Sequence, residues 1–537
     1  MAKDLKYFLI AGLSGLILGL SYPGNLNFSF LVWIGLVPLF WSLARTQAKF
    51  WTGYFAGLVY FLIVFRWCWD FYPLNAVGIA SHFFSAIIVL VLYALLVMTM
   101  AAFWGSFGYL FSKLSGSGRG AKFAFIGAPA LFILLEYART FGFGLVLAGS
   151  GTLFGPYWTM GNFVYSLADN PFILKLSSYI GIYGILFCVV LANYVFYHLL
   201  FHRDRGKMSL NKKGAFVIFL IAAIIILSYL YRPQNQPGTK KISYAIVQTD
   251  EASAIDQPAK VKLDDFKTEL AFLNQIAKQS PKSQLVLFPE ASDFLKNISA
   301  FLTTAQAEKY FDDLFPDSRL IISGSRIADT NNKTVSRVFA LDTKNGIIGY
   351  YDKRLLTPGG EFLPYAFKFA LNLSAKGKIS AFGQAREFSI GENKKTNFAL
   401  GGKFTVAPVV CSEIMSPDIV RKNSNGKDVI VAMASMAIYH GAKDNISEVL
   451  AVSRFRAAEN QKPLLLSANM GLSYAIDGRG VVQKITTDEQ PQILTGDMDI
   501  GQGKSWYNGY GNWPALIAAG LGVVALIFMN KKHVKSS

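Results

Sequence analysis

Cysteine, histidine and charged residues are all scarce in this chain of 537 residues. It has three cysteines, five histidines and only 16% charged residues. Three cysteines are too few for the disulfide framework of a small secreted domain. Only His440 lies between residues 240 and 505, which argues against a histidine-rich metal site there. The sequence therefore predicts neither a bound metal nor a cofactor.

Apolar residues, by contrast, are abundant. They make up 52% of the chain, aromatic residues make up 15%, and the mean hydropathy is +0.34. These values are high for a soluble protein, whose apolar share is usually about 45–50%. The length also exceeds what one hydrophobic core normally organises. We therefore expect several membrane spans and at least one globular domain.

Eight apolar runs are long enough, or nearly long enough, to cross a bilayer, which takes about 20 residues. The first two are short and are joined by the turn-like SYPGN, so they could form a hairpin that does not fully cross. The first could instead be a signal peptide, but no small-residue cleavage site follows it. The runs lie near residues 7–22, 28–44, 52–68, 84–112, 121–138, 172–201, 215–231 and 514–530.

Charge is distributed unevenly along the chain. Residues 232–510 carry 34 basic and 29 acidic residues, so most of the net charge of +18 lies elsewhere, in short segments between apolar runs. With the N-terminus in the cytoplasm, nearly all of those basic residues fall on the cytoplasmic side, as the positive-inside rule requires. This predicts that everything between the seventh and eighth runs faces outward. The excess charge does not imply nucleic-acid binding.

The segment 240–505 has the pattern of an α/β domain. Seven short runs rich in Val, Ile and Leu recur along it, and stretches with helical periodicity separate several of them. Continuous apolar strands that alternate with helices predict sheets covered on both faces. We therefore divide the chain into a membrane domain of seven spans (1–231), an extracytoplasmic catalytic domain (232–505), and a last span with a basic tail (506–537).

Residues with ionisable or reactive side chains lie at three strand ends of this domain. Glu290 ends LVLFPE, Lys353 and Glu361 lie in YYDKRLLTPGGEFLPY, and Cys411 precedes Glu413 in VVCSE. Strand ends of an α/β domain tend to share one face, where ligands bind. An acid, an ammonium group and a thiol are thus expected to converge.

These residue types suit covalent acyl chemistry. A cysteine attacks as a thiolate, Glu290 could take its proton, and Lys353 could stabilise the negative charge that develops. The backbone N–H of Ser412 is a natural second donor to that charge. Taken singly, Cys411 could be an inert core thiol, Glu290 a helix cap and Lys353 a solvated lysine. Only the combination favours catalysis; Glu361 and Glu413 could each be structural.

The three strand-end motifs resemble the Glu–Lys–Cys triad of the nitrilase superfamily, in order and in spacing. Further segments resemble motifs of one membrane-embedded branch, the apolipoprotein N-acyltransferases. EYARTFGFG resembles the E-W-L-R-G motif, and the block from RFRAAENQ to DGRG resembles R-x-R-A-x-E … N-x-G-x-S … D-x-x-G. The first of these motifs is residues 136–144 and the second is residues 454–480. Residues 177–194 resemble the family's glycine-containing sixth span, and residues 505–513 resemble its tail before the last span.

The resemblance implies a polytopic helical membrane domain, an αββα sandwich and a two-step reaction without a cofactor. Cys411 would take an acyl chain from a phospholipid as a thioester, and the N-terminal amine of a diacylglyceryl-cysteine lipoprotein would then take that chain. Glu290 would be the base and Lys353 the stabilising cation, with Glu361 and Glu413 as further acids of the family. The implied location is the bacterial inner membrane, with the catalytic domain in the periplasm.

Two alternatives remain open from the sequence. Water could resolve the thioester, which would make the protein a membrane-tethered amidase or hydrolase. The chain could also be a non-catalytic descendant that binds lipids or lipoproteins. Ser412 replaces the family's usual Tyr, 434-ASMAIYHG-441 departs from S-N-D-A-W-F-G, and 357-TPGGE-361 departs from V-P-F-G-E.

Glu136 and Arg139 stand near the outer end of the fifth apolar run. A guanidinium suits the phosphate of a phospholipid, so Arg139 is a candidate lipid contact. Equally, an acid and a base three residues apart could simply pair on one helix face.

Overall fold

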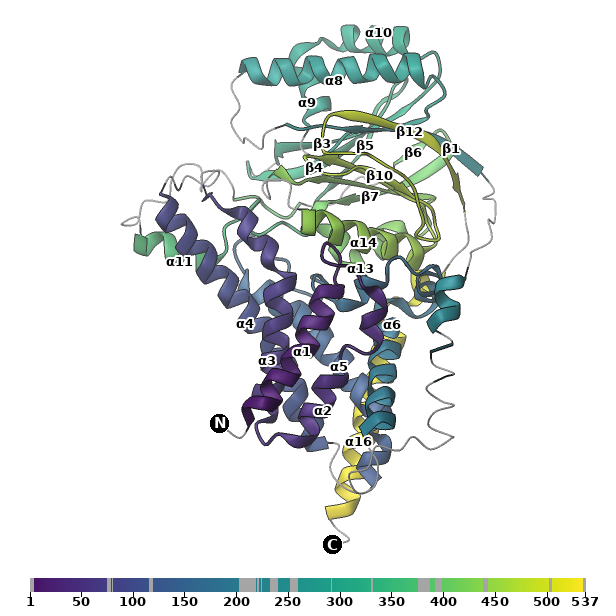
Figure 1. Cartoon of the computed structure of the whole chain (residues 1–537). Coiled ribbons are helices and arrows are strands. Elements are labelled where there is room, and N and C mark those ends of the chain that lie inside the picture. Colours follow the sequence, from purple (N-terminus) through teal and green to yellow (C-terminus); the bar gives the residue numbers. More distant parts are fainter. Residues whose placement is uncertain are drawn as a thin grey trace.

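The computed structural model describes most of the chain (Figure 1). The described residues are 4–534, apart from 75–78, 80, 115–118, 202–218, 220, 221, 224, 232–239, 252–258, 291, 330–331, 375–386, 392–397, 438–442 and 502–504. The basic segment 203–213 and seven residues of the expected seventh run, 215–231, fall outside these residues.

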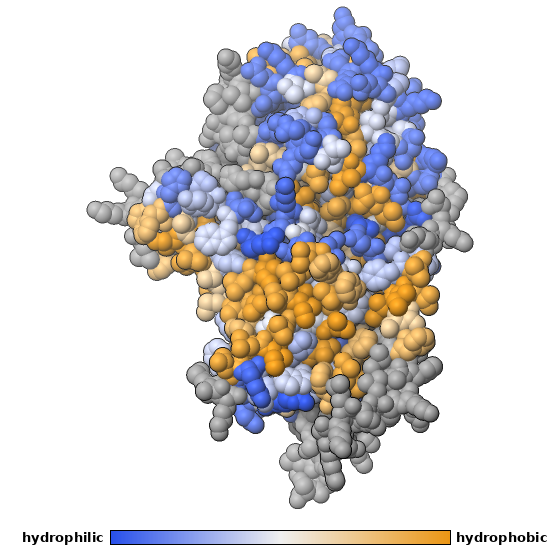
Figure 2. All heavy atoms as spheres, viewed as in Figure 1, coloured by the Kyte–Doolittle hydropathy of each residue, from blue (hydrophilic) through white to orange (hydrophobic). Residues whose placement is uncertain are grey.

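The lower part of the molecule is a helical bundle, and a broad apolar belt covers the face of it shown in Figure 2. Within the described part of the chain, three helices are long and apolar enough to cross a membrane, namely α4, α6 and the part of α5 from Ala124 to Val146. Shorter apolar helices accompany them. The bundle consists of α1 (Leu5–Ser21), α2 (Val37–Arg45), α3 (Lys49–Val64), α4 (His82–Leu114), α5 (Arg119–Val146), α6 (Pro171–Phe201) and α16 (Trp513–Val534).

The expected run 28–44 is not one helix. It forms a short 3₁₀ turn, η2 (Ser29–Trp33), and then α2, which starts anew at Val37. Pro38 stands in the first turn of α2, where its fixed φ and missing N–H favour a helix start over a continuing helix.

α6 is interrupted at Gly181, whose φ of +63° is a left-handed conformation that glycine adopts readily. A Cβ at this position would lie 2.5 Å from the ring of Tyr507, so no larger residue fits. The break frees the backbone N–H of Ile182, which donates to Glu459 Oε1 at 3.0 Å. A residue of the catalytic domain thus completes the hydrogen bonding of a bundle helix.

The upper part is a sandwich of two six-stranded sheets, ordered β12-β1-β2-β3-β4-β5 and β11-β10-β9-β8-β7-β6. The centre of each sheet is parallel, and the outer pairs are antiparallel. The strands are β1 (Lys240–Gln248), β2 (Leu285–Leu287), β3 (Leu320–Ala328), β4 (Thr334–Asp342), β5 (Gly346–Asp352), β6 (Ala399–Leu400), β7 (Phe404–Val410), β8 (Val429–Ser435), β9 (Leu464–Asn469), β10 (Tyr474–Ile476), β11 (Val482–Ile485) and β12 (Gln492–Ile500).

Helices cover both outer faces of the sandwich. α8 (Ala259–Gln279), α9 (Phe294–Phe301) and α10 (Thr304–Leu314) pack on the first sheet, and Figure 1 shows them at the far end from the bundle. α13 (Pro417–Ser424) and α14 (Lys443–Asn460) pack on the second sheet. The predicted α/β domain with covered sheets is confirmed.

The second helical layer is shared between the two parts of the molecule. α14 packs on β9 and also against α6, so it is buried along most of its length. One continuous hydrophobic core joins Val452 and Phe455 of α14 to Leu174 and Ile182 of α6. The membrane bundle is therefore packed directly against the catalytic domain.

Candidate active site

β7 delivers Cys411 to the edge of the second sheet. The strand is almost wholly buried, and Cys411 begins the 3₁₀ turn η7 (Cys411–Met415) directly after it. The φ of Cys411 is +48°, a conformation that costs a non-glycine residue about 1–3 kcal/mol. The half-buried thiol lines a small pocket together with Met415, Ala432 and Met436.

Lys353 follows β5 and is held between two carboxylates. Its Nζ lies 2.9 Å from Glu290 Oε1 and 2.8 Å from Glu361 Oε2, and all three side chains are buried. Backbone N–H groups complete the arrangement: that of Ser435 donates to Glu290 Oε2 at 3.1 Å, and that of Thr357 donates to Glu361 Oε2 at 2.7 Å. The buried charges are therefore paired and hydrogen-bonded, as burial demands.

Thr357 connects this ion cluster to the thiol, and sequence reasoning missed it. Its hydroxyl oxygen lies 3.3 Å from Lys353 Nζ and 4.0 Å from Cys411 Sγ. The structure thus brings Glu290, Lys353, Glu361 and Cys411 together at one edge of the sandwich. The position of Thr357 between Lys353 and Glu361 in the chain was the only sequence signal for it.

The electrostatics keep the thiol protonated in the resting state. Burial raises the pKa of Cys411 to about 12, and the nearby charge of Glu290 adds to the rise while Lys353 opposes it. Burial lowers the pKa of Lys353, but the charges of Glu290 and Glu361 outweigh it and hold this pKa well above its ordinary value. Lys353 therefore remains an ammonium group, and the thiol needs a base at the moment of attack.

Glu413 lies outside this cluster and supports the nucleophile turn. Its carboxylate accepts hydrogen bonds from Tyr351 Oη, from the backbone N–H of Arg354 and from that of Val410, at 2.8, 2.8 and 2.9 Å. It thereby ties the segment that carries Lys353 to the segment that carries Cys411. The neighbouring Ser412 does the same, because its hydroxyl donates to the carbonyl of Leu355.

Ser435, the donor to Glu290, is held in turn by Asn469 at the end of β9. The Asn469 amide donates to Ser435 Oγ at 3.1 Å and to the carbonyl of Glu251 at 2.9 Å. Its oxygen accepts from Thr249 Oγ1 at 2.9 Å. The ends of β1, β8 and β9 are thus fixed around Glu290 by one side chain, the Asn of the N-x-G-x-S motif, to which the sequence assigned no role of its own.

Glu136 and Arg139 do not reach the ion cluster. Arg139 is fully buried in the bundle, where it pairs with Glu136 and donates to the carbonyl of Met160 at 2.8 Å. Its guanidinium also lies over the ring of Phe61. Of the two roles weighed above, the structure shows the pairing on one helix face.

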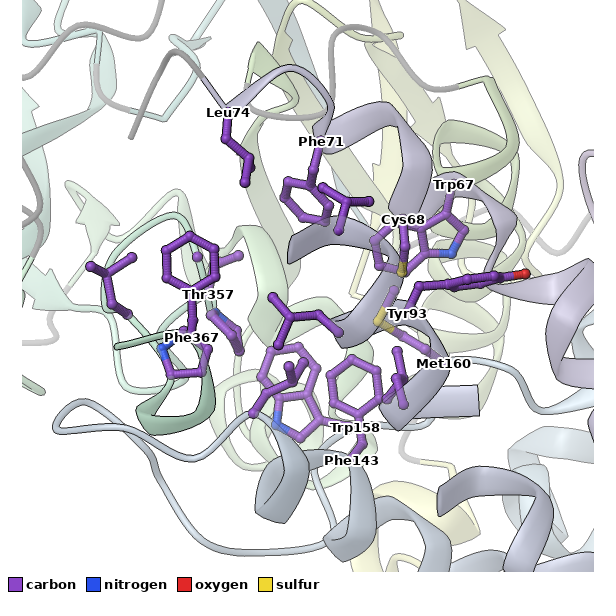
Figure 3. A pocket seen from close by; sticks show the side chains of 18 of the residues that line it. Trp67, Cys68, Phe71, Leu74, Tyr93, Phe143, Trp158, Met160, Thr357 and Phe367 are labelled. Atoms are coloured by element: carbon purple, nitrogen blue, oxygen red, sulfur yellow. The ribbon is translucent and has the colours of Figure 1, made fainter. Parts of the chain in front are cut away.

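A large apolar cavity opens between the bundle and the catalytic domain (Figure 3). Trp67, Phe71 and Leu74 line it from the segment before α4, and Phe143 lines it from α5. Across the cavity lie Thr357 and Phe367 of the catalytic domain, as Figure 3 shows. Trp158 and Met160 line both this cavity and the pocket of Cys411. The cavity and the pocket of the thiol are thus adjacent, with these two side chains between them.

Two family models match the chain. Residues 14–195 match the apolipoprotein N-acyltransferase N-terminal domain, and residues 232–508 match the carbon–nitrogen hydrolase model. The chain belongs to the carbon–nitrogen hydrolase family, in its apolipoprotein N-acyltransferase branch. The resemblance seen in the triad motifs and in the membrane half is thereby confirmed.

Full-length relatives carry the same two parts. An apolipoprotein N-acyltransferase of Geobacter metallireducens is 24% identical over 98% of this chain and 96% of its own. One from Thermotoga maritima is also 24% identical, over 98% of this chain and 94% of its own. Among solved structures, a carbon–nitrogen hydrolase from Helicobacter pylori is 14% identical, with a TM-score of 0.36 over 48% of this chain and 89% of its own.

Among the described residues, no group of three or more His, Cys, Asp or Glu side chains could hold a metal ion. His440 and the second half of the departure at 434–441 lie outside those residues.

Proposed function

We propose that this acyltransferase moves an acyl chain from a phospholipid to the N-terminal amine of a diacylglyceryl-cysteine lipoprotein, through a thioester on Cys411. One observation carries the proposal: the thiol stands beside the Glu290–Lys353–Glu361 cluster, in a pocket next to the apolar cavity between bundle and catalytic domain. The names of the full-length relatives support the same reaction.

In the first half-reaction Glu290 takes the proton of Cys411 as sulfur attacks the ester carbonyl carbon of the phospholipid. Lys353 and the backbone N–H of Ser412 stabilise the oxyanion of the tetrahedral intermediate. The carbon–oxygen bond then breaks, and Glu290 returns the proton to the departing alkoxide. The products are a thioester on Cys411 and a lysophospholipid.

In the second half-reaction the acceptor amine attacks the thioester carbon. Glu290 takes a proton from the amine, and Lys353 again stabilises the oxyanion. The carbon–sulfur bond then breaks, and the departing Cys411 thiolate receives the proton from Glu290. The product is an amide. Because each lipid substrate uses the site in turn, one apolar cavity serves both, and Glu361 keeps Lys353 in position throughout.

The same proposal includes the topology: eight spans in the bacterial inner membrane, with the catalytic domain in the periplasm. The distribution of basic residues between apolar runs supports this orientation. A tag placed at Ser537 should then be protected from protease in intact spheroplasts. Cleavage of the tag there would overturn the orientation.

The reaction itself is tested by mass spectrometry. Purified protein is incubated with a phospholipid and a diacylglyceryl-cysteine peptide, and the peptide should gain one acyl chain. Cys411→Ala should abolish this gain. Free fatty acid with an unmodified peptide would instead identify a hydrolase, and the absence of any acyl adduct on Cys411 would leave only lipid or lipoprotein binding.

A further inference from the structure

A second groove lies on the surface where α15 (Trp506–Tyr510) meets α16, and no residue lines both it and the active-site cavity or the pocket of Cys411. Arg421 of α13 stands at one end, and the side chains of the first turns of α16 form the rest. The lining includes Arg421, Tyr510, Trp513, Ile517, Ala518 and Leu521.

Aromatic side chains place the upper end of the groove at the membrane boundary. Trp506, Tyr510 and Trp513 are 62%, 58% and 65% exposed, and exposed Trp and Tyr gather where a bilayer meets water. Farther along α16 the exposed side chains, Ile517 and Leu521, are purely apolar. The groove therefore runs from headgroup level toward the hydrocarbon.

Arg421 brings a positive charge to the headgroup end. It is half-buried, and of its five N–H donors one is used by the backbone carbonyl of Asn508, at 3.2 Å. The nearest acid that pairs with it is Asp418, whose oxygen lies 3.8 Å from Nε, beyond hydrogen-bond range. Among the described residues, no acid accepts a hydrogen bond from this guanidinium, so it keeps N–H donors for the anion of a ligand.

Gly511 holds Arg421 in this place. Its φ is +63°, and a Cβ there would lie 2.8 Å from Arg421 Nε, so the backbone passes directly against the guanidinium. The Arg421 guanidinium is thus packed against the backbone of Gly511 rather than extended freely into solvent.

We propose that this groove binds one phospholipid molecule that is not consumed, with its phosphate on Arg421 and an acyl chain along Ile517 and Leu521. A planar guanidinium matches a phosphate by paired hydrogen bonds. The apolar stretch of α16 matches the chain. The site differs from the donor site because it lies on the surface formed by α13, α15 and α16. None of its lining residues also lines the pocket of Cys411.

The test uses the full chain in nanodiscs of phosphatidylethanolamine that contain a phosphatidylglycerol with a photoactivatable group in its acyl chain. After irradiation, adducts are mapped by peptide mass spectrometry. We expect them on residues 513–528, and we expect Arg421→Ala to reduce their yield at least about tenfold, the lower end of the effect of losing a hydrogen bond to a charged group. Lys422→Ala is the matched control, because it removes an equal charge from the next residue of α13, which does not line the groove.

A second variant keeps the test decisive if Arg421→Ala fails to fold. Ile517→Trp leaves the arginine in place and fills the groove, so it should displace adducts from Leu521 while melting like the wild type. Equal adduct yields on 513–528 in wild type, Arg421→Ala and Ile517→Trp would identify ordinary bilayer contact and overturn the proposal.

Discussion

At the residue scale, opposing electrostatic effects act on the pKa of the Cys411 thiol. Burial and the charge of Glu290 favour the protonated thiol, whereas Lys353 favours the thiolate. The site therefore stores the nucleophile in an unreactive form and depends on Glu290 to remove its proton when substrate is present. In an oxidising compartment, a thiol held this way is also protected from disulfide exchange and oxidation.

This arrangement predicts that Glu290→Gln has opposite effects on two reactions of the same sulfur. Loss of the carboxylate charge should lower the thiol pKa and make alkylation of Cys411 by iodoacetamide several-fold faster at pH 8. Loss of the base should slow acylation by phospholipid by about 10²–10⁴-fold. Both rates are measured on the Cys411 peptide by mass spectrometry.

Glu308→Gln, at an exposed position of α10, is the control and should leave both rates unchanged. If Glu290→Gln acylates at the wild-type rate, Glu290 is not the base.

The pH dependence of alkylation follows from the raised pKa of the Cys411 thiol. With a pKa of about 12, the thiolate fraction of Cys411 at pH 8 is about 10³-fold below that of a free cysteine of pKa about 8.5. Because the folded pKa is the higher one, reactivity should rise about tenfold per pH unit up to about pH 11. In denaturant the rate should level off near pH 9.5. A plateau at neutral pH in the folded protein would contradict the raised pKa.

At the element scale, the apolar runs predicted strands well where a strand is buried on both faces. All seven runs noted between residues 242 and 469 are strands, from β1 to β9. β5, β6, β10, β11 and β12 were not among these runs, because they are short or have partly exposed residues that weaken the apolar signal. Strand ends therefore located Glu290 and Cys411.

The supporting residues could not be found in this way. Thr357 acts from a loop, Asn469 acts by joining three strand ends, and the donor from Ser435 is a backbone N–H. Thr357 and Ser435 have no residue type or spacing that assigns this role before the chain is folded, and the N-x-G-x-S motif marks Asn469 without showing what it contacts. Glu413 was expected to be a supporting acid that could be structural, and its three hydrogen bonds serve the turn.

The break in α6 supplies an element-scale prediction. Gly181→Ala should destabilise the protein by about 2–4 kcal/mol, since it adds left-handed strain to a clash with Tyr507. Gly520→Ala on α16 is the matched control: a Cβ there meets nothing within 4 Å, and alanine favours a helix. Thermal unfolding in detergent measures both. Equal melting temperatures for the two variants would show that the break does not need glycine.

At the scale of the whole molecule, the bundle and the catalytic domain are tied by buried polar contacts as well as by packing. Tyr22, directly after α1, donates to Glu448 of α14 at 2.5 Å, and the backbone N–H of Gly161 donates to the same carboxylate at 3.0 Å. Arg66 and Asp444 form an ion pair between the two parts nearer the surface. Removal of the bundle would leave these groups and the apolar face of α14 in water.

The isolated segment 232–505 should therefore not behave as a free-standing α/β domain. We expect it to aggregate or to require detergent, because Val452 and Phe455 would lose the cover of α6. Size-exclusion chromatography without detergent checks this, with the full chain in detergent as the reference. A monodisperse, folded segment in plain buffer would contradict it.

The shared position of α14 also constrains how the molecule moves and comes apart. Because α14 packs against both α6 and β9 within one continuous core, hinge motion between the membrane and catalytic parts would break that core. Any movement that admits a lipid to Cys411 is then expected in the loops around the cavity. Unfolding should likewise be one cooperative event, in which the loss of either part removes the packing of the other.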